Sequence, residues 1–124
     1  MLLAHGARDP RWSAPFEDVA ERVRSAAPAL PVRLAFLEFM PPTLIEAGAS
    51  LVASGCDTVD VVPLFLGAGG HVRKDLPELL DRLRAEHPGV RWRLRQTIGE
   101  VDEVVEAMAQ AALRLCAGAP RAPR

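Results

Sequence analysis

The chain has 124 residues, of which 49% are apolar and 25% are charged, and its formal net charge is -1. This length suits one domain with a real core and is too short for two. The nearly neutral charge excludes a global attraction to nucleic acid or to an anionic membrane. We therefore expect one globular domain without a nucleic-acid or membrane partner, in which any anion is recognised by a local basic cluster.

Cysteine usage and the N-terminal pattern predict the compartment. Cys56 and Cys116 lack the spacing of a CxxC motif, which favours a reducing compartment over a structural disulfide. No run reaches the ~20 apolar residues that a membrane span needs, and no secretory signal pattern is present. We expect a cytoplasmic protein.

Apolar periodicity and turn residues divide the first half of the chain into strand and helix pairs. Residues 1–5 predict a short buried strand, and apolar residues at helical spacing predict a helix over 16–27. A second strand is expected over 32–38, and a second helix over 44–52 follows a proline pair. Gly55 stands where a helix C-cap is expected.

The second half repeats this alternation. Residues 58–66 predict a third strand, and the apolar run at its centre suggests burial on both faces. A helix is expected to begin near Lys74, and a half-exposed strand is expected over 90–96. The inward residues of that strand are predicted to be Val90, Trp92 and Leu94. A fourth amphipathic helix is expected over 101–115, and residues 117–124 are expected to be a disordered tail.

Four strand and helix alternations with short connections predict an α/β fold over residues 1–116. We expect three layers, with a mainly parallel four-stranded sheet flanked by helices, as in one half of a doubly wound unit. Ligands of such sheets bind outside the carboxyl ends of the strands. His5, Glu38 and His71 are all expected at or just beyond those ends.

The segment GAGGHV, residues 67–72, links the third strand to the third helix. It fails the dinucleotide fingerprint because Val72 occupies the last glycine position, and the chain has no P-loop. Its glycines can allow the backbone to approach something large and flat, or to adopt positive φ, beneath His71. The alternative is a phosphate-binding turn in which His71 is an N-terminal hydrogen-bonding residue.

Two histidines and a glutamate at one sheet edge indicate a metal site. Imidazole suits divalent transition metals, and His5 and His71 would leave open coordination positions. Glu38 is a candidate ligand or proton acceptor. Alternatively, His5 is a hydrogen-bonded histidine at a strand end, and Glu38 is a solvated carboxylate or the partner of an arginine.

Four basic residues flank the two histidine segments, and they are Arg8, Arg11, Arg73 and Lys74. Around one pocket they would favour a polycarboxylate ligand, although ordinary surface charge explains any one of them. Asp9 and Asp75 are expected to cap loops or helix starts. His87 is expected at a helix end away from the ligand edge, without a role in the site.

The segments LLAHGARDPRWSAPFE and VVPLFLGAGGHVRKDLP resemble the two signatures of the short class II tetrapyrrole chelatases of the CbiX and SirB type. These enzymes insert cobalt or ferrous iron into sirohydrochlorin. The segment AFLEFMPPTL is similar to the acidic, proline-containing segment between the signatures. The resemblance covers roughly residues 1 to 115.

This resemblance implies a lyase that serves cobalamin or sirohaem synthesis. His5 and His71 would bind the metal and, with Glu38, form the catalytic set. The tetrapyrrole would be held by Arg8, Arg11, Gly69, Gly70, Arg73 and Lys74. The divalent metal, cobalt, iron or nickel, would be a substrate, with no organic cofactor, and chains this short would pair as homodimers.

Two departures from the family pattern leave other functions open. Ala7 stands where the first signature usually has a serine, and the last helix lacks the expected arginine. A metal or tetrapyrrole carrier would use the same histidines without catalysing insertion. A flavodoxin-like domain is a further alternative, and bound flavin or nucleotide would identify it.

Overall fold

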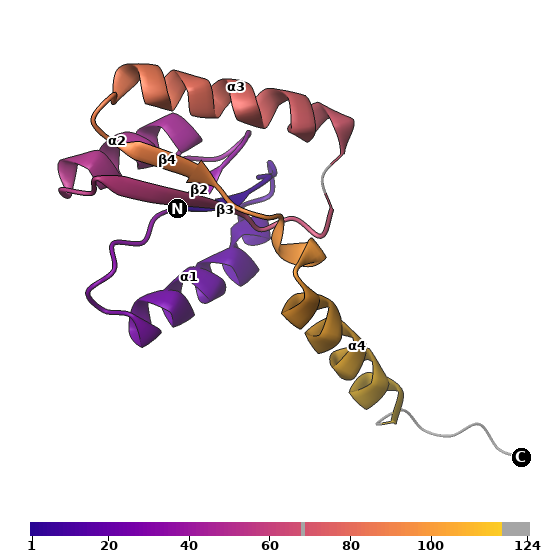
Figure 1. Ribbon diagram of the computed structural model, residues 1–124. Coiled ribbons are helices and arrows are strands. Elements are labelled where there is room, and N and C mark those ends of the chain that lie inside the picture. The colour runs from indigo at the N-terminus through magenta and orange to yellow at the C-terminus, as the bar shows by residue number, and fades with distance from the viewer. Residues whose placement is uncertain (68, 118–124) are drawn as a thin grey trace, which may run out of the picture.

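The fold is a parallel sheet between layers of helices, seen in a computed structural model that describes residues 1–67 and 69–117 except for the side chain of His71 (Figure 1). The strands are β1 (Leu2–Ala4), β2 (Leu34–Phe36), β3 (Thr58–Pro63) and β4 (Arg91–Leu94). The helices are α1 (Ala14–Ala26), α2 (Leu44–Ala53), α3 (Gly70–Glu86) and α4 (Asp102–Ala117). Two short 3-10 helices are η1 (Pro10–Ser13) and η2 (Ile98–Glu100).

The sheet has the strand order β2-β1-β3-β4, and its pairs are parallel. The chain passes from β1 outward to β2 and then crosses back to β3, so the order reverses between β1 and β3. In doubly wound sheets this switch point is where loops diverge and leave room for a ligand. The predicted α/β class and mainly parallel sheet are therefore confirmed.

The core lies mainly between the sheet and the α2 and α3 layer. Buried side chains of that layer and of the strands form one apolar cluster, whose largest members include Leu3, Leu51, Val61, Leu80, Leu83 and Trp92. A smaller cluster on the other face joins Ala20 of α1 to Ala4, Leu34 and Phe36. Burial of these apolar surfaces stabilises the fold and fixes the strand ends at one edge.

Local sequence signals set the ends of α2. Thr43 and Glu46 form a capping box, in which each side chain accepts a hydrogen bond of 3.1 Å from the other residue's backbone N–H. Gly55, with φ +91°, follows the helix in the left-handed conformation that terminates many helices. The expectation for Gly55 is confirmed.

The start of α3 differs from the expectation. The helix begins at Gly70 with Gly69 as its N-cap, one turn earlier than the predicted start near Lys74. The Arg73 backbone N–H donates to the Gly69 carbonyl at 3.0 Å and closes the first turn. The glycines delayed the predicted start because they are weak helix formers, yet they adopt helical geometry when the following turn is packed.

Burial of β3 and β4 is more one-sided than the apolar sequence predicts. Along β3, buried residues alternate with more exposed ones, and the half-buried positions are Asp60 and Val62. On β4, Trp92 is buried, but the predicted inward residue Leu94 is 42% exposed. Burial of β3 on both faces was a wrong prediction, because none of the helices in residues 1–67 and 69–117 covers the face that carries Asp60 and Val62.

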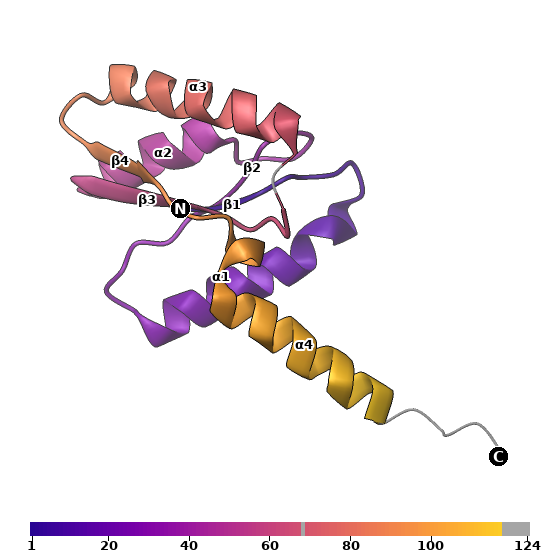
Figure 2. The same cartoon turned by 45° about the vertical axis from the view of Figure 1, so that its right-hand side comes forward.

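The fourth helix forms as predicted but does not pack on the sheet. It projects away from the body in both views (Figure 1, Figure 2), and none of its residues is buried. In the described part of the chain, no helix is long and apolar enough to cross a membrane. The tail was predicted over 117–124, but Ala117 is the last residue of α4. Residues 118–124 lie outside the described residues.

Candidate functional site

Two backbone hydrogen bonds beyond the strands bring His5 and Glu38 side by side. The Leu37 N–H donates to the Ala4 carbonyl at 2.9 Å, and the Glu38 N–H donates to the His5 carbonyl at 3.0 Å. These bonds continue the β1 and β2 pairing past the last strand residues. The predicted neighbours at the carboxyl edge are thus held together by the main chain.

Gly6 makes this close approach possible. It has φ +90°, and a Cβ at this position would collide with the backbone carbonyl oxygen of Glu38. That oxygen also accepts a hydrogen bond of 2.9 Å from the Met40 N–H. A side chain at position 6 would therefore displace the segment that carries Glu38, and only glycine also tolerates this φ without strain.

The His5 imidazole is fixed by an aromatic partner. Its ring stacks on Phe65 with centroids 4.0 Å apart and an interplanar angle of 24°. Phe65 is 2% exposed and follows β3, on the other side of the switch point. Because Phe65 is buried in the core, the stacking restrains the plane of the imidazole.

His5, Glu38 and Asp75 line one cavity of about 100 Å³, whose other lining residues are Leu37, Val72, Leu76 and Leu79. Asp75 lies inside α3 and not at its start, so the predicted capping role for Asp75 is wrong. No sequence signal indicated this placement, because it depended on where α3 begins.

The cavity offers one imidazole and two carboxylates from three different elements. Among the side chains that the structure describes, no three His, Cys, Asp or Glu groups converge closely enough to hold a metal ion. The side chain of His71 lies outside that description, so the predicted histidine pair stays a prediction. Imidazole can donate to a transition metal, and a carboxylate can take up a proton.

The glycines before and at the start of α3 leave open space. A Cβ placed on Gly67, Gly69 or Gly70 would meet nothing within 4 Å, and none of the three has a positive φ. Their backbone conformations therefore do not require glycine. These glycines form an open rim, because no side chains rise from the backbone there. The open rim agrees with the predicted approach of a large ligand.

The basic residues divide between the segment after β1 and the first turn of α3, and none of the four predicted ones lines the cavity of His5. Arg11 forms an ion pair of 2.9 Å with Asp9 at the start of η1. Side-chain hydrogen bonds from Arg11 lower the pKa of Asp9, and the same bonds raise the pKa of Arg11. The capping role predicted for Asp9 is confirmed. The guanidinium carbon of Arg8 lies 5.1 Å from the ring centroid of the exposed Phe39.

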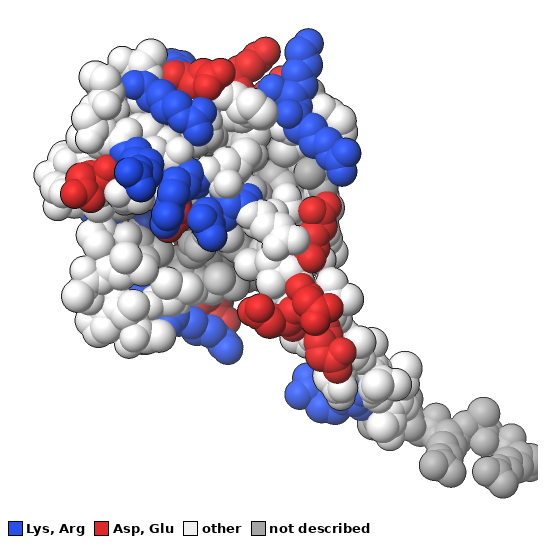
Figure 3. Space-filling view, in the orientation of Figure 1, with Lys and Arg blue, Asp and Glu red and all other residues white. Residues whose placement is uncertain are grey.

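The second basic group lies near the start of α3. Arg73 and Lys74 are exposed, and Arg73 lines a neighbouring cavity of about 350 Å³ together with Arg95 and Leu94. Figure 3 shows basic side chains gathered over the start of α3 and over β4. Arg95 was not predicted for the site, although its position just after β4 places it at the same carboxyl edge.

Comparison with known proteins finds a matching family model and related proteins. The CbiX family model matches residues 1–115. A sirohydrochlorin cobaltochelatase from Sulfurisphaera tokodaii is 30% identical over 108 residues, which cover 87% of this chain and 85% of that protein.

Two solved structures share the fold. A cobalamin biosynthesis CbiX protein from Marinobacter aquaeolei superposes with a TM-score of 0.82 at 35% identity, covering 95% of this chain and 96% of that one. SirB from Bacillus subtilis with Fe³⁺ superposes with a TM-score of 0.78 at 28% identity. The match covers 96% of this chain but 46% of SirB, so this chain spans about half the length of that protein.

Proposed function

The chain belongs to the CbiX family of class II chelatases, which are lyases, and on this premise we propose that it inserts Co²⁺ or Fe²⁺ into sirohydrochlorin or a related tetrapyrrole. The observation that carries the proposal is the placement of His5, stacked on Phe65 and joined to Glu38, in a cavity at the switch point of the sheet. An imidazole and a carboxylate in this position match the two needs of the reaction.

The first need is to hold a partly dehydrated ion. His5 and His71 would bind the metal as neutral imidazoles and leave positions open for the pyrrole nitrogens. The restraint on the His5 ring supports this role, because a ligand that keeps its orientation loses little freedom on binding. The metal is a substrate that leaves with the product, so open positions and easy release suit the reaction.

The second need is to remove two protons from the macrocycle. When M²⁺ replaces two pyrrole N–H protons, two protons must leave. Glu38 lies in the same cavity as His5 and is the proposed acceptor of one of them. The open glycine rim would let the flat ring approach at Gly69 and Gly70, while Arg8, Arg11, Arg73 and Lys74 would face its peripheral carboxylates.

The broader setting follows from the same proposal. We place the reaction in the cytoplasm, within cobalamin or sirohaem synthesis, with cobalt, iron or nickel as the inserted metal and no organic cofactor. We further propose that two copies pair as a homodimer. The match of this chain to about half of SirB supports pairing, because two copies would supply the length that SirB has in one chain.

An anaerobic absorbance assay tests the proposed activity. Purified protein is mixed with sirohydrochlorin and Co²⁺, Fe²⁺ or Ni²⁺, and each rate is compared with the same mixture without protein. We expect a rate above the protein-free rate for at least one metal, and the ratios rank the metals. Equal rates with and without protein for all three metals would contradict the proposal.

Replacing Glu38 with glutamine is expected to lower the insertion rate at saturating metal by about 10²- to 10⁴-fold, the usual contribution of a positioned proton acceptor. The amide keeps the size of the side chain but cannot accept the proton. Glu78→Gln, on the exposed side of α3, is the matched control and is expected to keep the wild-type rate. An unchanged rate in Glu38→Gln would show that another group accepts the proton.

Replacing Arg73 with glutamine is expected to raise KM for sirohydrochlorin several-fold and to leave KM for the metal unchanged. The reason is the loss of one charge-assisted contact to a peripheral carboxylate. Arg82→Gln is the control, because Arg82 lies on the same helix but forms an ion pair of 2.8 Å with Glu86. Steady-state rates over both substrate concentrations measure the difference, and equal KM values in the two variants would remove Arg73 from the binding site.

A further inference from the structure

The fourth helix carries an apolar stripe that no other element of the described chain buries. The stripe recurs at helical spacing and consists of Val101, Val104, Val105, Met108, Ala112 and Leu115. Val105, Met108 and Leu115 are 46%, 41% and 72% exposed. A helix of this length is marginal in water on its own, and most of its stability in proteins comes from packing an apolar face.

The start of α4 is held so that the helix leaves the body. The Gly99 N–H of η2 donates to the Phe65 carbonyl at 2.8 Å. A Cβ on Gly99 would collide with the backbone of Leu66, so η2 lies directly against the segment that follows β3. This contact is at the carboxyl edge of the sheet, and from there α4 runs outward (Figure 2).

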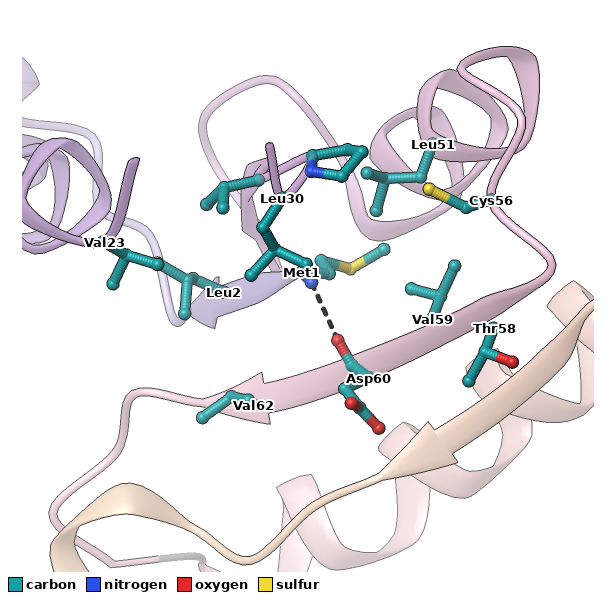
Figure 4. A pocket seen from close by; sticks show the side chains of 12 residues that line it. Met1, Leu2, Val23, Leu30, Leu51, Cys56, Thr58, Val59, Asp60 and Val62 are labelled. Atoms are coloured by element: carbon teal, nitrogen blue, oxygen red, sulfur yellow. Dashed lines mark hydrogen bonds between the residues drawn. The ribbon is translucent and has the colours of Figure 1, made fainter. Parts of the chain in front are cut away.

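Among the described residues, no helix covers the face of β3 and β4 that carries Asp60 and Arg93. Next to it, a mostly apolar hollow of about 260 Å³ lies between α1 and β3. Figure 4 shows Leu2, Val23, Leu30 and Val62 around this hollow. Leu30 lines the hollow and is 56% exposed.

Charge on this face complements the charge on α4. Arg93 forms an ion pair of 2.7 Å with Asp60, and strand alternation places Arg91 and Arg95 on the same side of β4. The first two turns of α4 carry the acidic residues Asp102, Glu103 and Glu106. Figure 3 shows basic side chains over β4 and acidic side chains over the start of α4.

We infer that two copies of this chain exchange α4, so that the helix of each covers the open β3–β4 face of the other. The inference rests on the proposed homodimer and specifies its interface. Because α4 leaves at the carboxyl edge, a two-fold arrangement brings the two carboxyl edges toward each other and runs each α4 antiparallel to the partner's strands. Its acidic start then lies near Arg95, and its apolar end reaches the hollow beside Leu30.

The lengths agree with this arrangement. The 16 residues of α4 extend about 24 Å, and the 6 residues of β3 extend about 20 Å. An α4 that starts at the carboxyl edge of the partner therefore reaches the opposite edge, where Leu30 lies. Each copy has one site formed by His5 and Glu38. Exchange also places the sites of the two copies on opposite sides of one cleft, which suits a flat substrate.

A disulfide between α4 and the hollow tests the exchange. Cys116, near the end of α4, is exposed, and a Leu30→Cys substitution in a Cys56→Ser background adds one thiol at the hollow. Under mild oxidation of the full chain, we expect a covalent dimer on a non-reducing gel. Glu78→Cys in the same background places the thiol on α3, beyond the opposite face of the sheet, and is expected to give no such dimer.

The outcomes separate the exchange from the pairing itself. A disulfide within one chain would show that α4 folds back on its own sheet and would overturn the inference. The Leu30→Cys variant could be a dimer by light scattering and yet form no disulfide between position 30 and Cys116. This result would overturn the exchange but leave the proposed pairing intact. A monomer at all concentrations would overturn both, whereas the activity assay is scored independently of either result.

Substitutions on α4 give a second test that does not depend on oxidation. Met108→Asp, on the apolar stripe, is expected to raise the dimer dissociation constant at least about tenfold, since it buries an unpaired charge in the interface. Leu113→Asp is the matched control, because Leu113 is 64% exposed on another side of the same helix. Equal dissociation constants in the two variants would overturn the inference.

Discussion

Replacing His5 with alanine is expected to lower the rate of metal insertion at least about a hundredfold, while the protein stays folded. Loss of an outer partner of a metal ligand already costs about 10- to 100-fold, and His5 is the proposed ligand itself. Its ring also stacks on Phe65 at 4.0 Å, so a loss of about 1 kcal/mol of stability is expected from the broken aromatic contact. Initial rates and thermal unfolding of the same preparation measure the two effects.

A second histidine in the chain provides the control for this substitution. His87 also contacts a buried aromatic ring, with its centroid 5.9 Å from that of Trp92. It lies at the C-terminal end of α3, away from the carboxyl edge of the sheet. His87→Ala is expected to lose similar stability and to keep the wild-type rate, and a wild-type rate in His5→Ala would remove His5 from the metal site.

Replacing Gly6 with alanine is expected to give the largest loss of stability of any single methyl addition proposed for this chain. The left-handed φ of +90° costs a non-glycine residue about 1–3 kcal/mol, and collision with the Glu38 carbonyl adds about as much again. Displacing that carbonyl also breaks the alignment of His5 and Glu38. The free energy of unfolding, measured with denaturant, and the insertion rate are both expected to fall.

Gly55 separates backbone strain from the collision. It has φ +91°, almost the same as Gly6, but a Cβ there would meet nothing within 4 Å. Gly55→Ala is therefore expected to lose only about 1–2 kcal/mol and to keep the wild-type insertion rate. Equal losses of stability and activity in the two variants would mean that the Glu38 contact is not what requires Gly6.

The sequence predicted the parts of the site that depend on strand ends. Apolar runs located β1 and β2, and because parallel strands end at one edge, the strand pattern alone was enough to place His5 and Glu38 together. The stacking of His5 on Phe65 could not be predicted, since it joins residues on either side of the switch point. Asp75 was misplaced because the glycines before it concealed the true start of α3.

The fourth helix shows a different limit of sequence patterns. Its apolar stripe correctly predicted a helix, but a pattern does not say which surface covers the stripe. The same limit explains β3, whose apolar run predicted burial on both faces although Asp60 and Val62 are only half-buried. Both differences have one cause if the covering surface belongs to a second copy of the chain.

The number of macrocycles converted by each protein chain tests the central claim most directly. Sirohydrochlorin and Co²⁺ are supplied anaerobically in large excess over wild-type protein and over His5→Ala, and the absorbance of the free macrocycle is followed to its end. The proposed function predicts many conversions per wild-type chain. With His5→Ala, it predicts almost no conversion beyond that seen without protein. A spectral change that stops at one equivalent per chain would contradict it and identify a binding protein that does not catalyse insertion.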